Sequence, residues 1–147
     1  MKKMIKKLLF LVLSLCLISN ASEANDCKIP IKIIKVIDGD TILAKIDQNQ
    51  FKIRLYGIDC YESSPDISRA YKQAYYNHID INTVVFYGRQ ATKELNKHLQ
   101  KKDIKFEFKG IDIYGRALGI LYDDKNVNIN ECMLKTPYCF SYNFKSF

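Results

Sequence analysis

Alternating apolar residues, broken by short turn signals, constrain the fold of this chain more than any other feature. Apolar side chains alternate with polar ones over 28–37, and the phase shifts at 34–36, which indicates a β-bulge. The Asp38-Gly39 pair is a turn signal, with Asp38 interpreted as a turn former, and 41–46 continues as a second strand. The pattern predicts an antiparallel hairpin.

Three further strands follow from the same pattern. A third strand is predicted over 51–58, which forms a meander with the first two, and a fifth over 117–122. The fourth covers 104–108, where Lys105 and Glu107 are expected to face away from the core.

Helical spacing occurs in two places. Apolar residues recur every four positions from Ala91 to Leu99, which predicts a helix over 89–100. A short last helix is predicted from Asn128 and is ended by Pro137. Three meandering strands, a helix and two more strands are the order of an OB-fold. We therefore predict an α+β protein, a five-stranded OB-fold barrel with two to three helices.

Residues 1–24 have the pattern of a secretory signal peptide. Four lysines precede an apolar run of 11 residues over 8–18, and small residues suited to cleavage follow. The run is short for a membrane span, so no stable span is expected. We expect an exported protein, periplasmic or secreted, with one domain over 25–147 that is a monomer.

The predicted domain is basic. Residues 25–147 include 19 basic and 15 acidic residues, a net charge of +4. A positive charge suits an anionic partner, although frequent lysine can also reflect coding bias. Charge alone does not choose between the two interpretations.

Charged residues gather where the predicted strands begin or end. Asp40 lies in the first turn, and Arg116 lies at the entrance to the fifth strand. Arg54, Asp59 and Glu62 accompany the end of the third strand. In a small barrel these ends can converge on one rim, so the five charges are candidates for one site.

The combination of charges has a specific chemical use. Two carboxylates and a main-chain carbonyl make a hard-oxygen site for a Ca²⁺ ion that keeps several waters. A third carboxylate can orient or deprotonate a water molecule, and two arginines can hold phosphate oxygens bidentately. Together they provide what the attack of water on a phosphodiester requires.

Four motifs carry a resemblance to a known family. They are VIDGDT (36–41), RLYGIDCYE (54–62), YGRQA (87–91) and DIYGRALGILY (112–122). With these motifs in order, the chain resembles the staphylococcal nuclease, or thermonuclease, family (SNase-like domain) over about residues 33–135.

The resemblance implies a metal site and a residue that acts on water. It implies that Asp40, Asp59 and the main-chain carbonyl of Cys60 bind Ca²⁺, and that Glu62 acts on the attacking water. The family usually has Thr-Pro where this chain has Cys60-Tyr61. A carbonyl ligand is indifferent to its own side chain, so the cysteine is compatible with the metal site.

The resemblance also implies how substrate is held. Arg54 and Arg116 would hold the phosphate, with Arg116 also neutralising or protonating the leaving oxygen, and Tyr114 would contact the nucleotide. The implied activity is Ca²⁺-dependent hydrolysis of DNA and RNA with little sequence preference, leaving products that end in 3′-phosphate.

Residues 63–86 form a longer segment than the family usually has at this place. The segment offers charge and stacking surface for single-stranded nucleic acid, or it forms a surface helix whose aromatic residues pack on the barrel. The residues concerned are Arg69, Tyr71, Lys72, Tyr75 and Tyr76.

Cys16 lies in the predicted signal peptide, so its removal leaves four cysteines: Cys27, Cys60, Cys132 and Cys139. The chain ends without the family's long final helix, and small exported domains often compensate for a small core with disulfides. We predict at least one disulfide that ties the C-terminal segment to the barrel. The pair is left open, and four reduced, buried thiols are the alternative.

Two other functions are open to such a chain. An OB-fold module can bind nucleic acid without cutting it, and an envelope protein can bind an anionic glycan through a basic face. The glycan hypothesis leaves Asp40, Asp59 and Glu62 without a role. Relatives that bind without cutting lose the acidic or arginine positions of the motifs, and this chain keeps all of them.

Overall fold

The computed structural model of the protein describes residues 27–143, so the signal peptide predicted at 1–24 lies outside the described residues. Within that part of the chain, no helix is long and apolar enough to cross a membrane.

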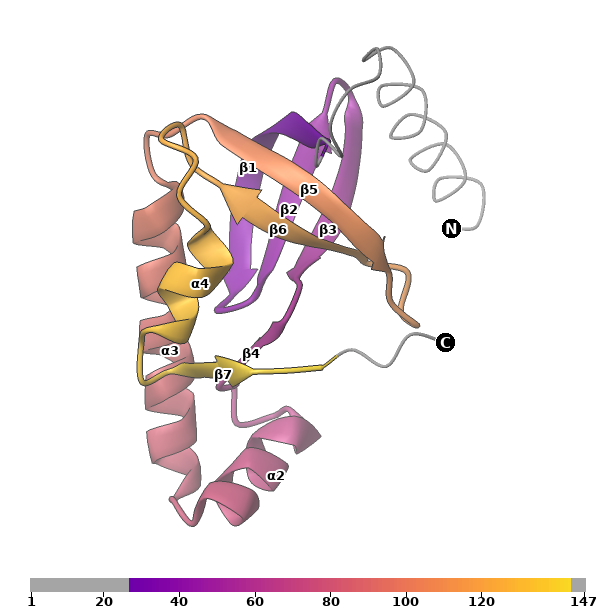
Figure 1. Cartoon of the computed structure of the whole chain (residues 1–147). Helices are drawn as coiled ribbons and strands as arrows, with labels where there is room; N and C mark the ends of the chain where they lie inside the picture. Colours follow the sequence, from indigo (N-terminus) through magenta and orange to yellow (C-terminus); the bar gives the residue numbers. More distant parts are fainter. Residues whose placement is uncertain (1–26, 144–147) are drawn as a thin grey trace.

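Five strands close into a barrel with the order β1-β2-β3-β6-β5 (Figure 1). β3 and β6 pair in parallel, and the other neighbouring pairs, including the closing pair β1–β5, are antiparallel. The predicted five-stranded OB-fold barrel is therefore confirmed. Its strands are β1 (Lys28–Asp38), β2 (Thr41–Ile46), β3 (Asn49–Leu55), β5 (Ile104–Ile111) and β6 (Ala117–Tyr122).

The predicted bulge in the first strand is confirmed. The β1–β2 register shifts between Ile33 and Lys35, and again between Val36 and Asp38. Bulges bend a strand and increase its twist, which helps a small sheet to close on itself. The bend brings Asp38 to the tight turn that leads into β2.

The third strand is shorter than predicted. β3 ends at Leu55, and Gly57 has a φ of 80°. This left-handed backbone conformation, which glycine adopts without a side-chain clash, breaks the strand. The chain continues as β4 (Ile58–Cys60), which pairs outside the barrel with β7 (Cys139–Ser141).

Within residues 27–143, three helices accompany the barrel: α2 (Ser68–Asn77), α3 (Ile81–Leu99) and α4 (Ile129–Leu134). The first lies in the segment 63–86. The second begins eight residues before the predicted start, because Asp80 caps it by accepting from the backbone N–H groups of Asn82 and Thr83. The last helix begins after Asn128, as predicted.

The core lies inside the barrel and under the long helix α3. Leu95 and Ala91 on α3 are fully buried and contact the barrel core, as does Phe106 on β5. Glu107 alternates along β5 with Phe106 and Phe108, which pack in the core, so it faces away from the core as predicted. It is nevertheless buried, because it accepts a hydrogen bond from Tyr122 Oη at 2.8 Å and forms an ion pair with Lys109.

One disulfide ties the C-terminal segment to the rest of the domain. It joins Cys60 on β4 to Cys139 on β7, within the small sheet that these strands form. The prediction of such a disulfide is confirmed, and the model identifies the pair that the sequence left open. Cys132, on α4, takes no part in it.

Replacing Cys139 with serine should lower the free energy of unfolding by roughly 2–4 kcal/mol, because the disulfide restricts the unfolded chain. Urea unfolding without reductant measures the change. Cys132→Ser is the matched control and should lower the free energy of unfolding much less than Cys139→Ser does, because Cys132 is half-buried and takes no part in the disulfide. Equal stability of both variants would contradict the structural role of the Cys60–Cys139 bond.

Candidate active site

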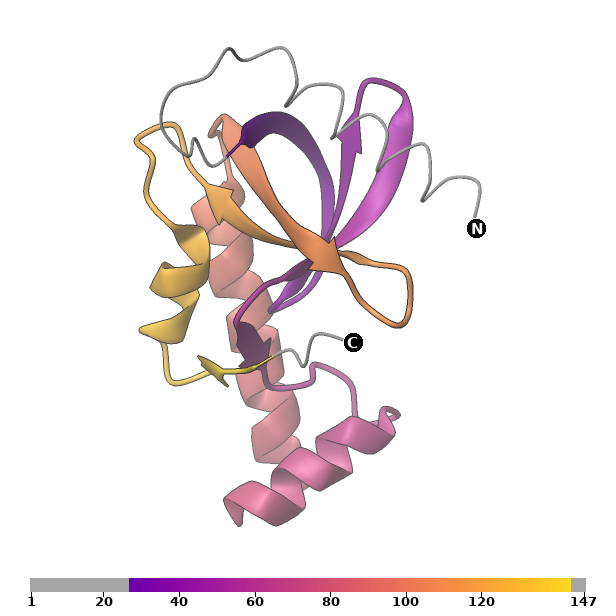
Figure 2. The same ribbon diagram turned by 45° about the vertical axis from the view of Figure 1, so that its right-hand side comes forward.

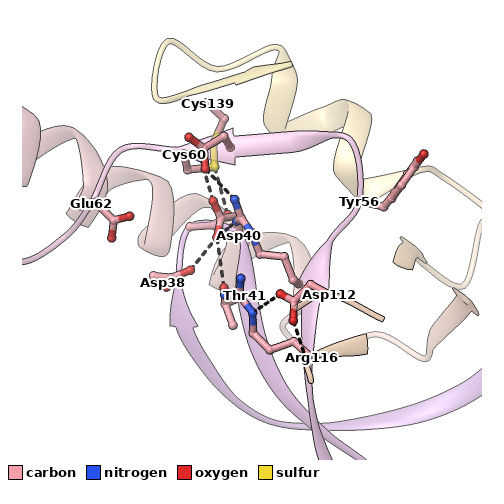
Figure 3. Close-up of polar contacts among 12 residues, drawn as sticks. Asp38, Asp40, Thr41, Tyr56, Cys60, Glu62, Asp112, Arg116 and Cys139 are labelled. Atoms are coloured by element: carbon pink, nitrogen blue, oxygen red, sulfur yellow. Dashed lines mark hydrogen bonds and ion pairs between the residues drawn. A yellow bond between two sulfur atoms is a disulfide. The ribbon is translucent and has the colours of Figure 1, made fainter. Parts of the chain in front are cut away.

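The candidate residues meet at one rim of the barrel, where the β1–β2 turn, the end of β3, β4 and the start of β6 come together (Figure 3). At the turn, Asp38 Oδ1 accepts the backbone N–H of Asp40 at 3.1 Å, as expected for a turn former. Burial raises the pKa of the Asp38 carboxyl. Figure 3 shows Tyr56 pointing away from this cluster.

Asp40 is held between the turn and β4. Its Oδ2 accepts the backbone N–H of Cys60 at 2.8 Å, and its Oδ1 accepts from the Thr41 hydroxyl at 3.1 Å. Its main-chain oxygen accepts the N–H of Leu55 at 2.8 Å. These contacts from three parts of the chain fix a carboxylate that is only 7% exposed.

Arg54 lies at the centre of the site. It reaches from β3 to both predicted metal-binding carboxylates, contacting Asp40 Oδ1 and lying 2.6 Å from Asp59 Oδ1. Burial lowers the pKa of the guanidinium, which the Asp59 charge opposes. A buried cation is costly unless carboxylates compensate it, so Arg54 brings Asp40 and Asp59 to one place.

Helix α2 positions the segment that carries Glu62. The buried side chain of Gln73 accepts the N–H of Glu62 at 2.9 Å and donates to the carbonyl of Cys60 at 3.0 Å. One amide thus holds the predicted carbonyl ligand and the backbone of the predicted base. Burial raises the pKa of Glu62, and the charge of Arg69 partly offsets this.

Arg69 is a site residue that the sequence analysis considered only as part of a charged surface. Its guanidinium contacts Asp59 Oδ1, and its Nε lies 3.5 Å from Glu62 Oε1. Arg69 and Gln73 are four residues apart on one helix, so they lie one above the other. The spacing shows that the two side chains share a helix face, and the position of α2 beside β4 places that face in the site.

Arg116 and Tyr114 extend the site from the β5–β6 turn. Asp112 organises the turn by accepting the N–H groups of both residues and binding Arg116 Nε at 2.6 Å. The charge of Arg116 lowers the pKa of Arg54 further, after the larger effect of burial. Tyr114 is 72% exposed, and its ring centroid lies 5.4 Å from the Arg116 guanidinium carbon.

Two glycines of the quoted motifs allow close packing at the site. A Cβ on Gly39 would lie 2.5 Å from the Cβ of Ala91 on α3. A Cβ on Gly88 would lie 2.3 Å from the backbone carbon and oxygen of Glu62. The glycine in the YGRQA motif therefore lets α3 contact the segment that positions the candidate base.

The donor groups at this rim fit a hard divalent cation. Asp40 and Asp59 are close enough to share contacts with Arg54, and the Cys60 carbonyl has a second lone pair besides the one that Gln73 uses. Two carboxylates and a carbonyl suit Ca²⁺ or Mg²⁺ with several waters. Among residues 27–143, no group of three or more His, Cys, Asp or Glu side chains is placed to hold a metal ion by itself, so the main-chain carbonyl and waters would have to complete the ligand set.

A comparison with known protein families identifies a nuclease family with which this fold and site agree. The family described as "Staphylococcal nuclease homologue" matches residues 52–146. The chain belongs to the staphylococcal nuclease family. The match begins at the third strand, so it includes Arg54, Asp59, Glu62 and Arg116, while Asp40 lies ahead of it.

Several curated relatives carry nuclease names. An "Uncharacterized endonuclease" of Haemophilus influenzae is 30% identical over 136 residues, which are 92% of this chain and 60% of the relative. The "Thermonuclease" of Staphylococcus hyicus is 31% identical over 121 residues, 80% of this chain and 59% of the relative. An "Uncharacterized endonuclease" of Escherichia coli O157:H7 is 26% identical over 111 residues, 76% and 60% respectively. The chain spans about 60% of the length of these relatives.

Gly88→Ala should destabilise the domain by about 1–3 kcal/mol, because the added methyl group overlaps the backbone of Glu62. The sign of this change in the free energy of unfolding is diagnostic. Replacing glycine with alanine inside a helix normally stabilises the helix by about 1 kcal/mol. Chemical unfolding measures the change, with Asn96→Ala at an exposed position of α3 as the control. A Gly88→Ala variant as stable as the wild type would contradict the packing argument.

Proposed function

We propose that this chain is an exported, Ca²⁺-dependent nuclease that hydrolyses phosphodiester bonds of DNA and RNA with little sequence preference. The observation that carries the proposal is the contact of one buried arginine, Arg54, with both Asp40 and Asp59. Glu62 and Arg116 lie at the same rim. Family membership and the nuclease names of the relatives support the activity, and the pattern of residues 1–24 supports export.

The metal would be held by Asp40, Asp59 and the main-chain carbonyl of Cys60. When bound, it would supply positive charge that stabilises the phosphate oxygens as charge develops on them. Arg54, beside both carboxylates, and Arg116, from the β5–β6 turn, would bind the same phosphate with planar donor pairs.

The reaction is the replacement of one P–O bond by another. A water oxygen bonds to phosphorus as the bond to the 5′ oxygen breaks, and the phosphate stays on the 3′ side. Glu62 would take the proton of the water, for which its raised pKa is favourable. Arg116, which reaches the rim from the β5–β6 turn, would stabilise the negative charge on the departing oxygen until that oxygen takes a proton.

The purified protein should degrade both plasmid DNA and RNA in Ca²⁺ and neither in EGTA, with electrophoresis of the products as the measurement.

Glu62→Gln should lower turnover by about 10²–10⁴-fold, because the proton acceptor is lost. Its binding of an oligonucleotide should change little. Wild-type turnover in Glu62→Gln would remove this residue from the mechanism, and binding without cleavage by the wild type would favour a binding module.

Arg54→Lys and Arg116→Lys should each lose most activity although the positive charge is kept, because lysine lacks the planar pair of donors. Initial rates on plasmid DNA at saturating Ca²⁺ measure the effect, and circular dichroism checks folding of each variant. Arg89→Lys, at an exposed position of α3, is the control and should keep the wild-type rate. Near-normal rates in both site variants would reject bidentate phosphate binding.

A further inference from the structure

Helix α2 carries three exposed tyrosines next to the candidate site. The exposed fractions are 60% for Tyr71, 76% for Tyr75 and 75% for Tyr76. The alternative in which these aromatic rings pack on the barrel is therefore wrong. The helix is instead anchored by Ala70 and Gln73, which are buried.

One row of side chains along α2 begins inside the site. Arg69, Lys72 and Tyr76 are spaced i, i+3 and i+7, so they lie along one face of the helix. Arg69 contacts Asp59 and approaches Glu62, while Lys72 and Tyr76 follow along the helix. At 1.5 Å per residue, the row from Arg69 to Tyr76 is about 10 Å long.

The row combines positive charge with an aromatic platform. The side chain of Arg69 is 41% exposed although it is ion-paired, and Lys72 is exposed. Tyr75 meets Tyr76 edge to face, with ring centroids 5.5 Å apart, and so restricts the ring of Tyr76. Proteins that bind single-stranded nucleic acid use two kinds of side chain. Cationic side chains follow the phosphate backbone, and aromatic rings stack on the bases.

The row lies on the other side of the site from Tyr114. In Figures 1 and 2 the β5–β6 turn, which carries Tyr114, lies above the small sheet of β4 and β7, and α2 lies below it. A nucleic-acid strand with one phosphate at Arg54 can extend to both sides. Tyr114 is then placed for one side, and Lys72 and Tyr76 for the other.

We propose that Lys72 and Tyr76 form an additional nucleotide subsite, in which Lys72 binds a phosphate and a base of single-stranded DNA or RNA stacks on Tyr76. This inference rests on the proposed function, because it continues the strand whose phosphate occupies the site. A duplex keeps its bases stacked inside, so the subsite favours single-stranded substrate.

The test measures binding without cleavage. Fluorescence anisotropy of a labelled 12-nucleotide single strand and of a labelled hairpin duplex is recorded in EGTA with the Glu62→Gln protein. Adding Lys72→Gln and Tyr76→Ala should weaken single-strand binding by about tenfold or more, in line with the loss of one stacked base. Duplex binding should fall by less than about threefold.

Three further variants make the test specific, each in the same Glu62→Gln protein. Tyr71→Ala removes an exposed tyrosine from the opposite flank of the same helix and should leave both affinities within about twofold. Tyr76→Phe keeps the stacking ring and should bind like its parent, whereas Tyr76→Ala alone should not. Circular dichroism and thermal melting confirm that each variant keeps its fold.

Two results would overturn the subsite. One is unchanged single-strand affinity in the Lys72→Gln/Tyr76→Ala protein. The other is an equal loss of affinity for the single strand and for the duplex, which would mean that the two residues contribute only nonspecific electrostatic attraction. Failure of the proposed function gives a different result. If the wild-type protein cuts neither DNA nor RNA, but Lys72→Gln/Tyr76→Ala still weakens single-strand binding, catalysis is refuted and the subsite is kept.

Discussion

The buried ion pairs of Arg54 are the interaction on which the site depends. Its side chain, only 4% exposed, lies between Asp40 on the β1–β2 turn and Asp59 on β4. A buried guanidinium needs such partners, so the arginine on β3 determines how closely the turn and β4 approach. Because both carboxylates contact one cation, they are also close enough to serve one metal ion. The same pairing thus supports the fold and the proposed chemistry.

The second requirement is that β4 stays in place, because three residues form a weak strand by themselves. Two other elements supply the support, one far away in the sequence and one that follows β4 closely. β7 pairs with β4 and is joined to it by the Cys60–Cys139 disulfide, and α2 reaches Cys60 and Glu62 through the side chain of Gln73. Both supports act within two residues of Asp59 or Glu62. The C-terminal segment and the segment 63–86 are therefore part of what positions the site.

Much of the barrel could be predicted, because half-buried strands leave an alternating pattern. The strands at 41–46 and 117–122 have the predicted bounds. The break in the third strand is not predicted, because the expected strand 51–58 runs through Gly57, whose left-handed conformation leaves no mark in the apolar pattern. The charges of the motifs were predicted to share one rim. The role of Arg69 was not, since it depends on where α2 lies relative to β4, which no local pattern determines.

The central claim is that the carboxylates gathered by Arg54 hold the metal that the reaction requires. The Ca²⁺ dependence of oligonucleotide cleavage tests this most directly, when it is measured for the wild type and for Asp59→Asn. The wild-type rate should rise with Ca²⁺ to saturation, and Asp59→Asn should need about tenfold more Ca²⁺ or more, because a charged oxygen ligand is lost. Cleavage by the wild type in EGTA, or the same Ca²⁺ dependence in both proteins, would contradict the account.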